Sequence, residues 1–365
     1  MNKKNREENE VEIDFSEGLN PKKGKNKSNK KAKKNRFKSL PKWEKALIIV
    51  ISVLLVIALI LGGLLIYVMS GLHGEELKQE NLGISADISD KYGKSDVKNI
   101  VVFGVDTRND NNFKGNSDVI MIVSVDKKKN TVKLSSILRD SYVAIDGKSN
   151  QKITHAYGYG GAELAVKTLN KNFNMNITDY VTLNFGKLSE AIDILGGVDI
   201  EITESERFQI NNISNDDGRK VPLVKKSGKV HLTGQQAVTF ARLREADSDI
   251  VRSSRQKKVI DALLTQAKLV NPIKYPELVN KMITLCETSL TTTEILSFAP
   301  MMTSGFTIST LTIPGEPEKA IGGIYEGYWV WRYDLKAAAE RLHQFIYEDA
   351  PVTETTAPTT AKPKK

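Results

Sequence analysis

The chain has 365 residues, 40% of them hydrophobic and 27% charged, so it is long enough to bury the core of one large or two small domains. Residues 1–45 hold 15 of the 53 Lys and Arg and 7 of the 44 Asp and Glu, so this segment carries 15 − 7 = +8 of the formal net charge of +9. The rest of the chain is almost neutral, which leaves it no excess positive charge for binding nucleic acid, and its single cysteine excludes an internal disulfide.

The first structural feature along the chain is an apolar segment directly after the basic one. Residues 46–70, ALIIVISVLLVIALILGGLLIYVMS, contain no charge and exceed the roughly 20 residues that a helix needs to cross a bilayer. The segment is longer, and lies deeper in the chain, than the apolar region of a cleaved signal peptide. We therefore expect an uncleaved transmembrane helix at 46–70, with a cytoplasmic tail at 1–45 and the rest of the chain outside the cell. Anionic lipid explains the basic tail more simply than nucleic acid does.

The segment after the anchor alternates between strand and helix patterns. A polar connecting stretch, 71–97, leads into the strand-like runs KNIVVFGVDTR, SDVIMIVSVD, TVKLSSILRD, DYVTLNF, VDIEI and TISTLTIPG. Helical spacing occurs in GGAELAVKTLNKNF, FGKLSEAIDILGG, TGQQAVTFAR, SRQKKVIDALLTQAKLV and PIKYPELVNKMITLC. These elements predict one α/β domain over 98–348, with a central mixed β-sheet flanked by helices. The Pro- and Thr-rich residues 349–365 predict a disordered tail.

Two features of this domain have a structural interpretation. Cys286 lies in the apolar-spaced stretch LVNKMITLCETSL, which predicts a buried core thiol rather than a nucleophile. HAYGYGGAEL predicts a glycine-rich turn before a helix, without a Walker or Rossmann motif, and His155 is expected to order this turn or to act as a general base.

Two carboxylates are candidates for a metal site. Asp106 ends one predicted strand and Asp118 begins the next, so a hairpin-like connection brings them together. Two carboxylates with water and substrate phosphate are a common way of holding Mg²⁺ in proteins. The alternative is that one caps a turn and the other pairs with a lysine.

Two arginines follow directly on predicted strands. Arg108 comes after IVVFGVDT and Arg139 after KLSSIL, which predicts that both lie at one edge of the sheet. Ligands of α/β proteins bind beyond the ends of strands, so charge at this edge favours a binding site. The alternative for Arg139 is a structural pair with Asp140.

The richest charged segment is FARLREADSDIVRSSRQ, at 240–256. Arg242 and Arg244 share one face if the backbone there is extended. Arg252, Arg255 and Gln256 have the spacing of one helix face. Planar arginine donors suit phosphate oxygens, and together with the carboxylates they favour a pyrophosphate site. The alternative is a solvated face on which the arginines pair with Glu245, Asp247 and Asp249.

These motifs, in this order behind a membrane anchor, resemble the LytR-CpsA-Psr family of cell-envelope proteins. The resemblance covers residues 99–260, including NIVVFGVDTR, SDVIMIVSVD, LSSILRDSYV, KITHAYGYGGAEL, HLTGQQAVTFARLR and DSDIVRSSRQKKVI. It departs from the family at Val251, where a small residue is common. The resemblance implies that Asp106 and Asp118 bind Mg²⁺ or Mn²⁺ and that Asp249 is a catalytic acidic residue. It also implies a pyrophosphate-binding set, of which the first four are also catalytic candidates: Arg108, Arg139, Arg242, Arg244, Arg252, Arg255 and Gln256.

The resemblance further implies an activity at the outer face of a bacterial cell membrane. It is the transfer of an anionic glycopolymer, such as wall teichoic acid or capsule, from a polyprenyl-pyrophosphate lipid to peptidoglycan through a phosphodiester. Two alternatives stay open, namely a hydrolase of the same lipid pyrophosphate and a non-catalytic binding or regulatory protein of the envelope. The expected partners are the lipid-linked glycan, peptidoglycan and the membrane, and no nucleic acid.

Overall fold

A computed structural model of the chain describes residues 77–107, 113–216, 221–243 and 249–349. In these four ranges no helix is long and apolar enough to span a bilayer. The transmembrane helix predicted at 46–70, the basic tail at 1–45 and residues 350–365 of the predicted disordered tail lie outside the described residues.

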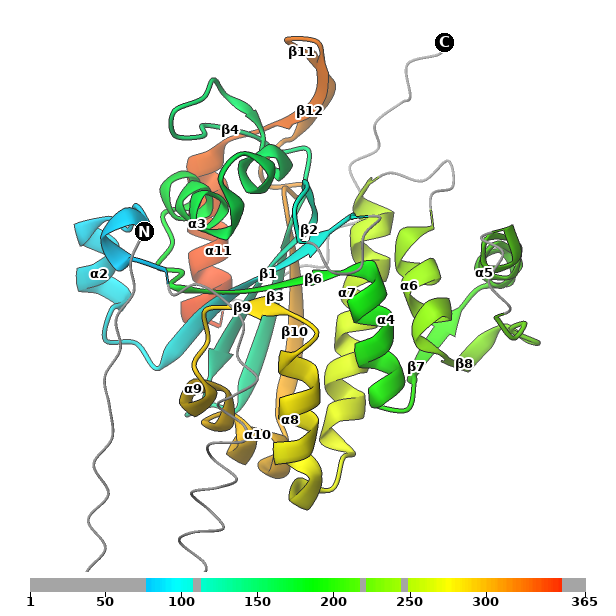
Figure 1. Ribbon diagram of the computed structural model, residues 1–365. Helices are drawn as coiled ribbons and strands as arrows, with labels where there is room; N and C mark the ends of the chain where they lie inside the picture. Colours follow the sequence, from blue (N-terminus) through cyan, green and yellow to red (C-terminus); the bar gives the residue numbers. More distant parts are fainter. Residues whose placement is uncertain (1–76, 108–112, 217–220, 244–248, 350–365) are drawn as a thin grey trace, which may run out of the picture. The chain divides into compact units, whose positions relative to one another are not determined.

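The described chain alternates between strands and helices, as Figure 1 shows. The strands are β1 (Val97–Val105), β2 (Ser117–Asp126), β3 (Thr131–Ile137), β4 (Tyr142–Val143), β5 (Gln151–Lys152), β6 (Asp179–Asn184), β7 (Val198–Ile202), β8 (Gly228–Leu232), β9 (Glu287–Thr288), β10 (Thr307–Ile313), β11 (Ile321–Tyr325) and β12 (Tyr328–Arg332). The α-helices are α2 (Ala86–Tyr92), α3 (Thr154–Phe173), α4 (Phe185–Ile194), α5 (Glu204–Asp216), α6 (Gly234–Arg242), α7 (Asp249–Lys268), α8 (Tyr275–Ile283), α9 (Thr292–Leu296), α10 (Ala299–Ser304) and α11 (Leu335–Tyr347). Two short 3-10 helices are η2 (Gln79–Asn81) and η3 (Pro272–Lys274).

The centre of the domain is a six-stranded mixed sheet, as predicted. Its strand order is β10-β3-β2-β1-β6-β9. The pairs β1/β6 and β3/β10 are parallel, whereas β1/β2, β2/β3 and β6/β9 are antiparallel. Strands β1, β3, β6 and β10 therefore run in the same direction and end at the same edge of the sheet, where β2 begins.

Apolar side chains cover both faces of this sheet because alternate residues of its strands point to opposite sides. Along β2, Ile120 and Ile122 join a core cluster with α3 and α11, whereas Met121 and Val125 join a second cluster with α7 and α10. The sheet is thus buried between two helical layers, which positions its strand ends rigidly.

A third core cluster lies beside the sheet. Strands β7 and β8 pair only with each other, and their apolar faces pack with α4, α5, α6 and α7. Helix α6 begins at a capping box, in which the Thr233 hydroxyl accepts from the Gln236 backbone N–H and the Gln236 side chain accepts from the Thr233 backbone N–H. This cap fixes where α6 starts. The helix ends at Arg242, because the next residue, Leu243, leaves helical geometry with ψ 129°.

The glycine-rich turn predicted before a helix is found at Gly160 and Gly161, where the backbone leaves helical geometry and Gly161 has φ +61°. Residues with a Cβ rarely adopt this left-handed conformation. A further helical segment, which was not predicted, precedes the turn from Thr154, so α3 consists of two helical segments joined at a kink. His155 consequently lies in the first turn of α3.

Candidate active site

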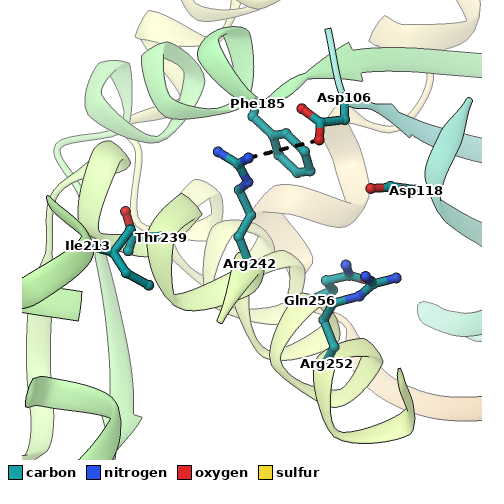
Figure 2. A pocket seen from close by; sticks show the side chains of 8 residues that line it. All are labelled: Asp106, Asp118, Phe185, Ile213, Thr239, Arg242, Arg252 and Gln256. Carbon is teal, nitrogen blue, oxygen red and sulfur yellow. Dashed lines mark ion pairs between the residues drawn. The ribbon is translucent and has the colours of Figure 1, made fainter. Parts of the chain in front are cut away.

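A pocket of about 330 Å³ lies at the edge of the sheet where β1 and β6 end and β2 begins. It combines acidic, basic and apolar side chains from six parts of the fold, namely the end of β1, β2, α4, α5, α6 and α7 (Figure 2). Its lining residues are Asp106, Asp118, Phe185, Ile213, Thr239, Arg242, Arg252 and Gln256.

The predicted hairpin brings both carboxylates to this pocket. Asp106 follows the last residue of β1, and Asp118 is the second residue of β2. The two strands pair antiparallel, and a shift in register after Gly104 places Val105 opposite Ser117. Asp106 therefore lies just beyond the last pair of the ladder, and Asp118 is the extra residue of β2 between Ser117 and Val119. Both side chains border the pocket.

Arg139 lies beside the same pocket. It is the second residue after the end of β3. Its Nη1 donates to Asp118 Oδ1 at 2.7 Å, and its Nε lies 3.6 Å from Asp140 Oδ2. The sequence left open either a ligand-binding or a structural role for this arginine. The structure shows it holding Asp118 in place at the pocket wall.

Arg242 is the last residue of α6, and the backbone leaves the helix at Leu243, which has φ −52° and ψ 129°. Its guanidinium carbon lies 4.7 Å from the centre of the Phe185 ring, and its Nη2 lies 3.9 Å from Asp106 Oδ2. The Arg242 and Asp106 side chains are 49% and 47% exposed. Phe185 positions the cation, and the long, exposed ion pair leaves it accessible to a ligand.

Helix α7 supplies Arg252 and Gln256, but Arg255 points elsewhere. Arg252 and Gln256 are four residues apart and face the pocket together. Arg255 is 100° further round the helix from Gln256. Its Nε donates to Glu206 Oε1 at 2.8 Å and its Nη1 to the Leu243 carbonyl at 3.4 Å. The structure therefore places Arg255 in a buried ion pair with α5 rather than in the pocket wall.

The structure does not describe the side chains of three predicted site residues. Arg108 and Arg244 lie outside the described residues, and Asp249 begins α7 but its side chain is not described. Their roles stay predictions.

Four residues of this region were missed by reasoning from the sequence: Phe185, Ile213, Thr239 and Glu206. Phe185 directly follows β6, which is parallel to β1, so the rule that located Asp106 at a strand end would also have located Phe185. Ile213, Thr239 and Glu206 carry no such signal, because helix contacts alone bring them here.

Oxygen donors at the pocket suit a hard divalent cation. Asp106 and Asp118 are carboxylates, the ligand type that Mg²⁺ prefers, and Mg²⁺ is commonly held by one or two carboxylates together with substrate phosphates. Among the described residues no group of three or more His, Cys, Asp or Glu side chains gathers as a metal cage. Asp106 and Asp118 are the carboxylates of the pocket that would hold such an ion.

The chain is similar to a group of known proteins. The sequence model of the LytR_cpsA_psr family matches residues 69–345. A Bacillus cereus (strain AH820) protein, "Polyisoprenyl-teichoic acid--peptidoglycan teichoic acid transferase TagU", is 30% identical over 77% of this chain and 89% of its own length. The corresponding TagT of Bacillus subtilis (strain 168) is 29% identical over 68% of this chain and 81% of its own.

The fold agrees with these sequence matches. The solved structure titled "TagT bound to LI-WTA" superposes with a TM-score of 0.57 and 25% identity, covering 70% of this chain and 91% of that chain. The structural match spans most of both proteins, and the range of the family model, 69–345, includes the sheet and the helices that form the pocket. The chain therefore belongs to the LytR_cpsA_psr family.

Proposed function

We propose that this protein transfers an anionic glycopolymer from a polyprenyl-pyrophosphate carrier to peptidoglycan, where it becomes attached through a phosphodiester. The observation that carries the proposal is one pocket that combines two carboxylates, two arginines and a glutamine at a strand edge. The names of the relatives support it, since TagU and TagT are each called a polyisoprenyl-teichoic acid--peptidoglycan teichoic acid transferase.

The pocket supplies what a pyrophosphate donor needs. Arg242 and Arg252 offer planar, permanently charged donors for phosphate oxygens, and Gln256 adds an amide beside them. Arg252 is only 8% exposed, so its charge acts in surroundings of low dielectric constant, where it stabilises an anion more strongly. Phe185 and Ile213 give the pocket an apolar wall next to these cations, which suits the prenyl part of the donor.

In the proposed reaction a sugar hydroxyl of peptidoglycan attacks the phosphorus nearest the glycan. The new P–O bond forms as the bond to the bridging oxygen breaks, and polyprenyl phosphate leaves with the electron pair, while the hydroxyl proton is lost to a base. Negative charge grows on the bridging and equatorial oxygens, and positioned cations lower the barrier by stabilising it. Arg242 and Arg252 would serve that role, and the candidates for the base are Asp249 and the region of the carboxylates Asp106 and Asp118.

Asp106 and Asp118 would hold Mg²⁺, or Mn²⁺ in its place. When bound, such an ion neutralises phosphate charge and polarises the phosphorus centre. The chain itself orients the two carboxylates, because Arg139 fixes Asp118 and the β1–β2 ladder fixes both backbone positions.

We further propose that the protein is anchored in a bacterial cell membrane by residues 46–70, with the catalytic domain outside. The charge-free run of 25 residues and the net +8 of the segment before it support this orientation. In that location the lipid carrier is in the same membrane as the enzyme.

The test uses the full-length protein in detergent, a polyprenyl-pyrophosphate-linked glycan labelled in the sugar, and peptidoglycan free of wall polymer. We expect label to become covalently attached to peptidoglycan, attachment to stop with a chelator and to return with Mg²⁺. Asp106→Asn should reduce the rate by about 100-fold or more, because it removes one charged oxygen donor at the reacting centre. Release of the glycan to water without attachment would instead indicate a hydrolase, and attachment that resists the chelator would overturn the metal assignment.

A further inference from the structure

Beyond the pocket, the same edge of the domain carries a continuous row of aromatic side chains. The rings of Tyr159, His155, Tyr328, Tyr325 and Tyr142 follow one another, and we call these five residues the aromatic surface. His155 lies 5.9 Å from Tyr159 and 5.7 Å from Tyr328, and Tyr142 lies 5.1 Å from Tyr325. Tyr325 and Tyr328 face each other across the β11–β12 hairpin, which closes the row.

The aromatic surface is exposed although its rings are held in place. Tyr159, Tyr325 and Tyr328 are 47%, 39% and 49% exposed. The Tyr159 hydroxyl donates to Gln151 Oε1 at 2.6 Å, and the Tyr142 hydroxyl donates to Glu326 Oε2 at 3.2 Å. These hydrogen bonds fix the orientation of two of the rings.

His155 adds a polar edge to the surface. Its Nδ1 lies 3.0 Å from the same Gln151 oxygen, which makes Nδ1 the donor and Nε2 an acceptor. Burial lowers the pKa of His155 and the positive charge of Lys152 lowers it further, which favours the neutral ring.

The hairpin that carries two of the rings is attached to the body of the domain beside β4 (Figure 1). Ser141 forms a parallel bridge with Trp331, and the Trp331 backbone N–H donates to the Asp140 carbonyl at 2.9 Å. Glu326 and Gly327 form its tight turn with φ of +49° and +83°, a geometry that matches the twist of a two-stranded ribbon. The hairpin therefore presents Tyr325 and Tyr328 from a defined position.

Two sets of contacts connect the aromatic surface to the pocket. In the first, Lys152, the neighbour of Gln151, donates to Asp140, and Arg139 next to Asp140 donates to Asp118. In the second, the Thr154 hydroxyl at the start of α3 donates to the carbonyl of Ser117, the residue before Asp118, at 2.9 Å. The aromatic surface thus lies at the strand edge that holds the carboxylates.

We propose that the aromatic surface is the subsite for the acceptor, and that it binds the glycan strand of peptidoglycan. The inference rests on the proposed function, because a transferase must hold an acceptor sugar next to the donor phosphate. Sugar rings present flat C–H faces with hydroxyls at their edges. Exposed tyrosine faces suit the former, and the flanking Gln151, Glu326 and Arg332 suit the latter.

The aromatic surface carries charges of both signs. The carboxylate of Glu326 lies at the tip of the hairpin, and the cations Lys148 and Arg332 lie over the rings of Tyr159 and Tyr325, at 5.1 and 4.5 Å from the ring centres. Carboxylate oxygens accept hydrogen bonds from sugar hydroxyls, and ammonium and guanidinium groups donate to them, so this mixture suits a glycan. Basic side chains beside apolar ones are also a feature of surfaces that bind anionic lipid, so the experiment includes vesicles as the competing partner.

The experiment compares variants on two separate elements with a control on the same hairpin. Tyr159→Ala changes α3, and Tyr328→Thr changes β12 with a residue that favours strands. The control is Ile324→Thr, because Ile324 is 78% exposed and alternates to the opposite face of the hairpin from Tyr325. Thermal unfolding of all three full-length proteins in detergent checks that each is folded.

Binding is measured by co-sedimentation with peptidoglycan free of wall polymer, and turnover by the transfer assay at varied acceptor concentration. We expect both tyrosine variants to raise the dissociation constant and the acceptor KM at least fivefold while the donor KM stays unchanged, and the control to match the unaltered protein. The double variant should lose more than either single one.

Co-sedimentation is also measured with phosphatidylglycerol vesicles in place of peptidoglycan. Three outcomes would overturn the inference: an unchanged acceptor KM in both tyrosine variants, an equal loss of binding in Ile324→Thr, or tyrosine variants that lose binding to the vesicles and not to peptidoglycan. Failure of the proposed function has a different signature, since the unaltered protein would then transfer no glycan at any acceptor concentration.

Discussion

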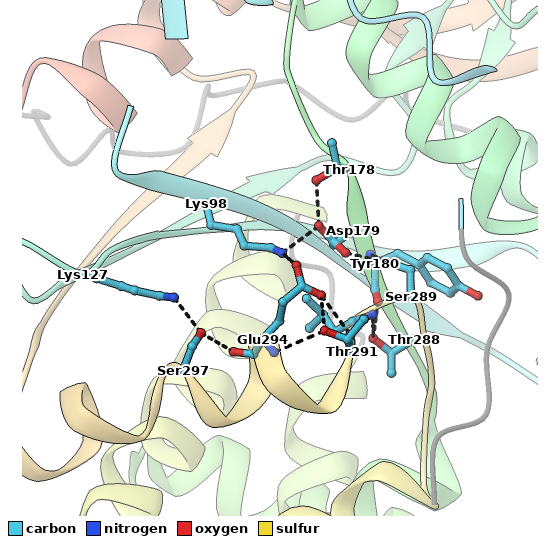
Figure 3. A network of polar contacts seen from close by, with 11 residues as sticks. Lys98, Lys127, Thr178, Asp179, Tyr180, Thr288, Ser289, Thr291, Glu294 and Ser297 are labelled. Atoms are coloured by element: carbon cyan, nitrogen blue, oxygen red, sulfur yellow. Dashed lines mark hydrogen bonds and ion pairs between the residues drawn. The ribbon is translucent and has the colours of Figure 1, made fainter. Parts of the chain in front are cut away.

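Two clusters of charged side chains lie at opposite ends of β1, and they are built differently. Near the start of the strand, Lys98 Nζ contacts Asp179 at 3.1 Å and also donates to Glu294 (Figure 3). Just beyond its end, Arg242 and Asp106 are 3.9 Å apart and about half exposed. The first cluster is closed by short hydrogen bonds, whereas the second is open to solvent.

The hydrogen bonds around the first cluster indicate a structural role. Asp179 also accepts from the hydroxyls of Thr178 and Ser289, and Glu294 caps the start of α9 through Thr291. These contacts attach β9 and α9 to the sheet. A long, exposed ion pair such as Arg242 with Asp106 contributes little stability, so folding alone does not account for the second cluster, and the proposed ligand-binding role is tested below.

Arg242→Gln tests the open cluster and has the largest expected effect. Loss of a cation aimed at the reacting phosphate should lower the transfer rate by about 100- to 1000-fold. The free energy of unfolding should change by less than about 0.5 kcal/mol, because the ion pair is exposed. Rate and urea unfolding are measured on the same preparation, with Lys281→Gln, in an exposed pair with Glu277, as the control that changes neither. A large loss of stability would make Arg242 a structural residue.

Glu206→Gln tests how much the buried ion pair between Glu206 and Arg255 contributes to the stability of the protein. The Glu206 and Arg255 side chains are only 10% and 6% exposed, so breaking the pair should cost about 3 kcal/mol at pH 7. Burial alone would raise the pKa of Glu206, but hydrogen bonds from Arg255 and Thr203 outweigh it and lower the pKa. A lowered pKa means that this stabilisation is present above the unfolded-state pKa, about 4.3, and is lost as the pH falls through the folded-state pKa.

The stability difference between the unaltered protein and Glu206→Gln should therefore shrink on acidification. Urea unfolding at pH 7 and at several values below pH 4.5 measures it. A difference that stays constant down to pH 3 would contradict the assignment of the charge interaction to Glu206.

Lys98→Met tests the closed cluster and has the smallest expected effect. Lys98 is 24% exposed, and its loss leaves Asp179 with hydroxyl partners, so we expect a cost of about 1–2 kcal/mol in unfolding free energy. The transfer rate per folded molecule should not change, since the cluster lies at the far end of the strand. If that rate fell as strongly as in Arg242→Gln, the distinction between the two clusters would be wrong.

Much of the fold follows from the sequence because its elements are strongly patterned. The runs that became β1, β2, β3 and β6 are apolar on both faces, which is typical of strands buried between helical layers. The β11–β12 hairpin and α11 were not predicted. GGIYEGYWVW contains many glycines and exposed aromatic residues without a clear alternation of apolar and polar positions, so nothing local marks it as two strands.

The candidate site shows the same limit at the level of single residues. Asp106, Asp118, Arg242, Arg252 and Gln256 were chosen from strand ends and helix spacing, and all five border one pocket. Arg255 is adjacent to Gln256 in the sequence, yet its side chain turns to Glu206 of α5, which lies on that side of α7. Successive residues of a helix are about 100° apart around its axis, so the sequence spacing locates a side chain only approximately on the helix surface. Which side chain it contacts depends on the element that packs there.

The sequence by itself determined the strands and helices around the site, the family, and the carboxylates and arginines from which the pocket is built, because these depend on local pattern and residue chemistry. The tertiary structure alone decided which charges are closed into pairs and which face a ligand. It also decided that Tyr142, His155, Tyr159, Tyr325 and Tyr328, from three distant segments, form one surface beside that pocket. Contacts between segments far apart in the chain are set by packing, and no local pattern encodes them.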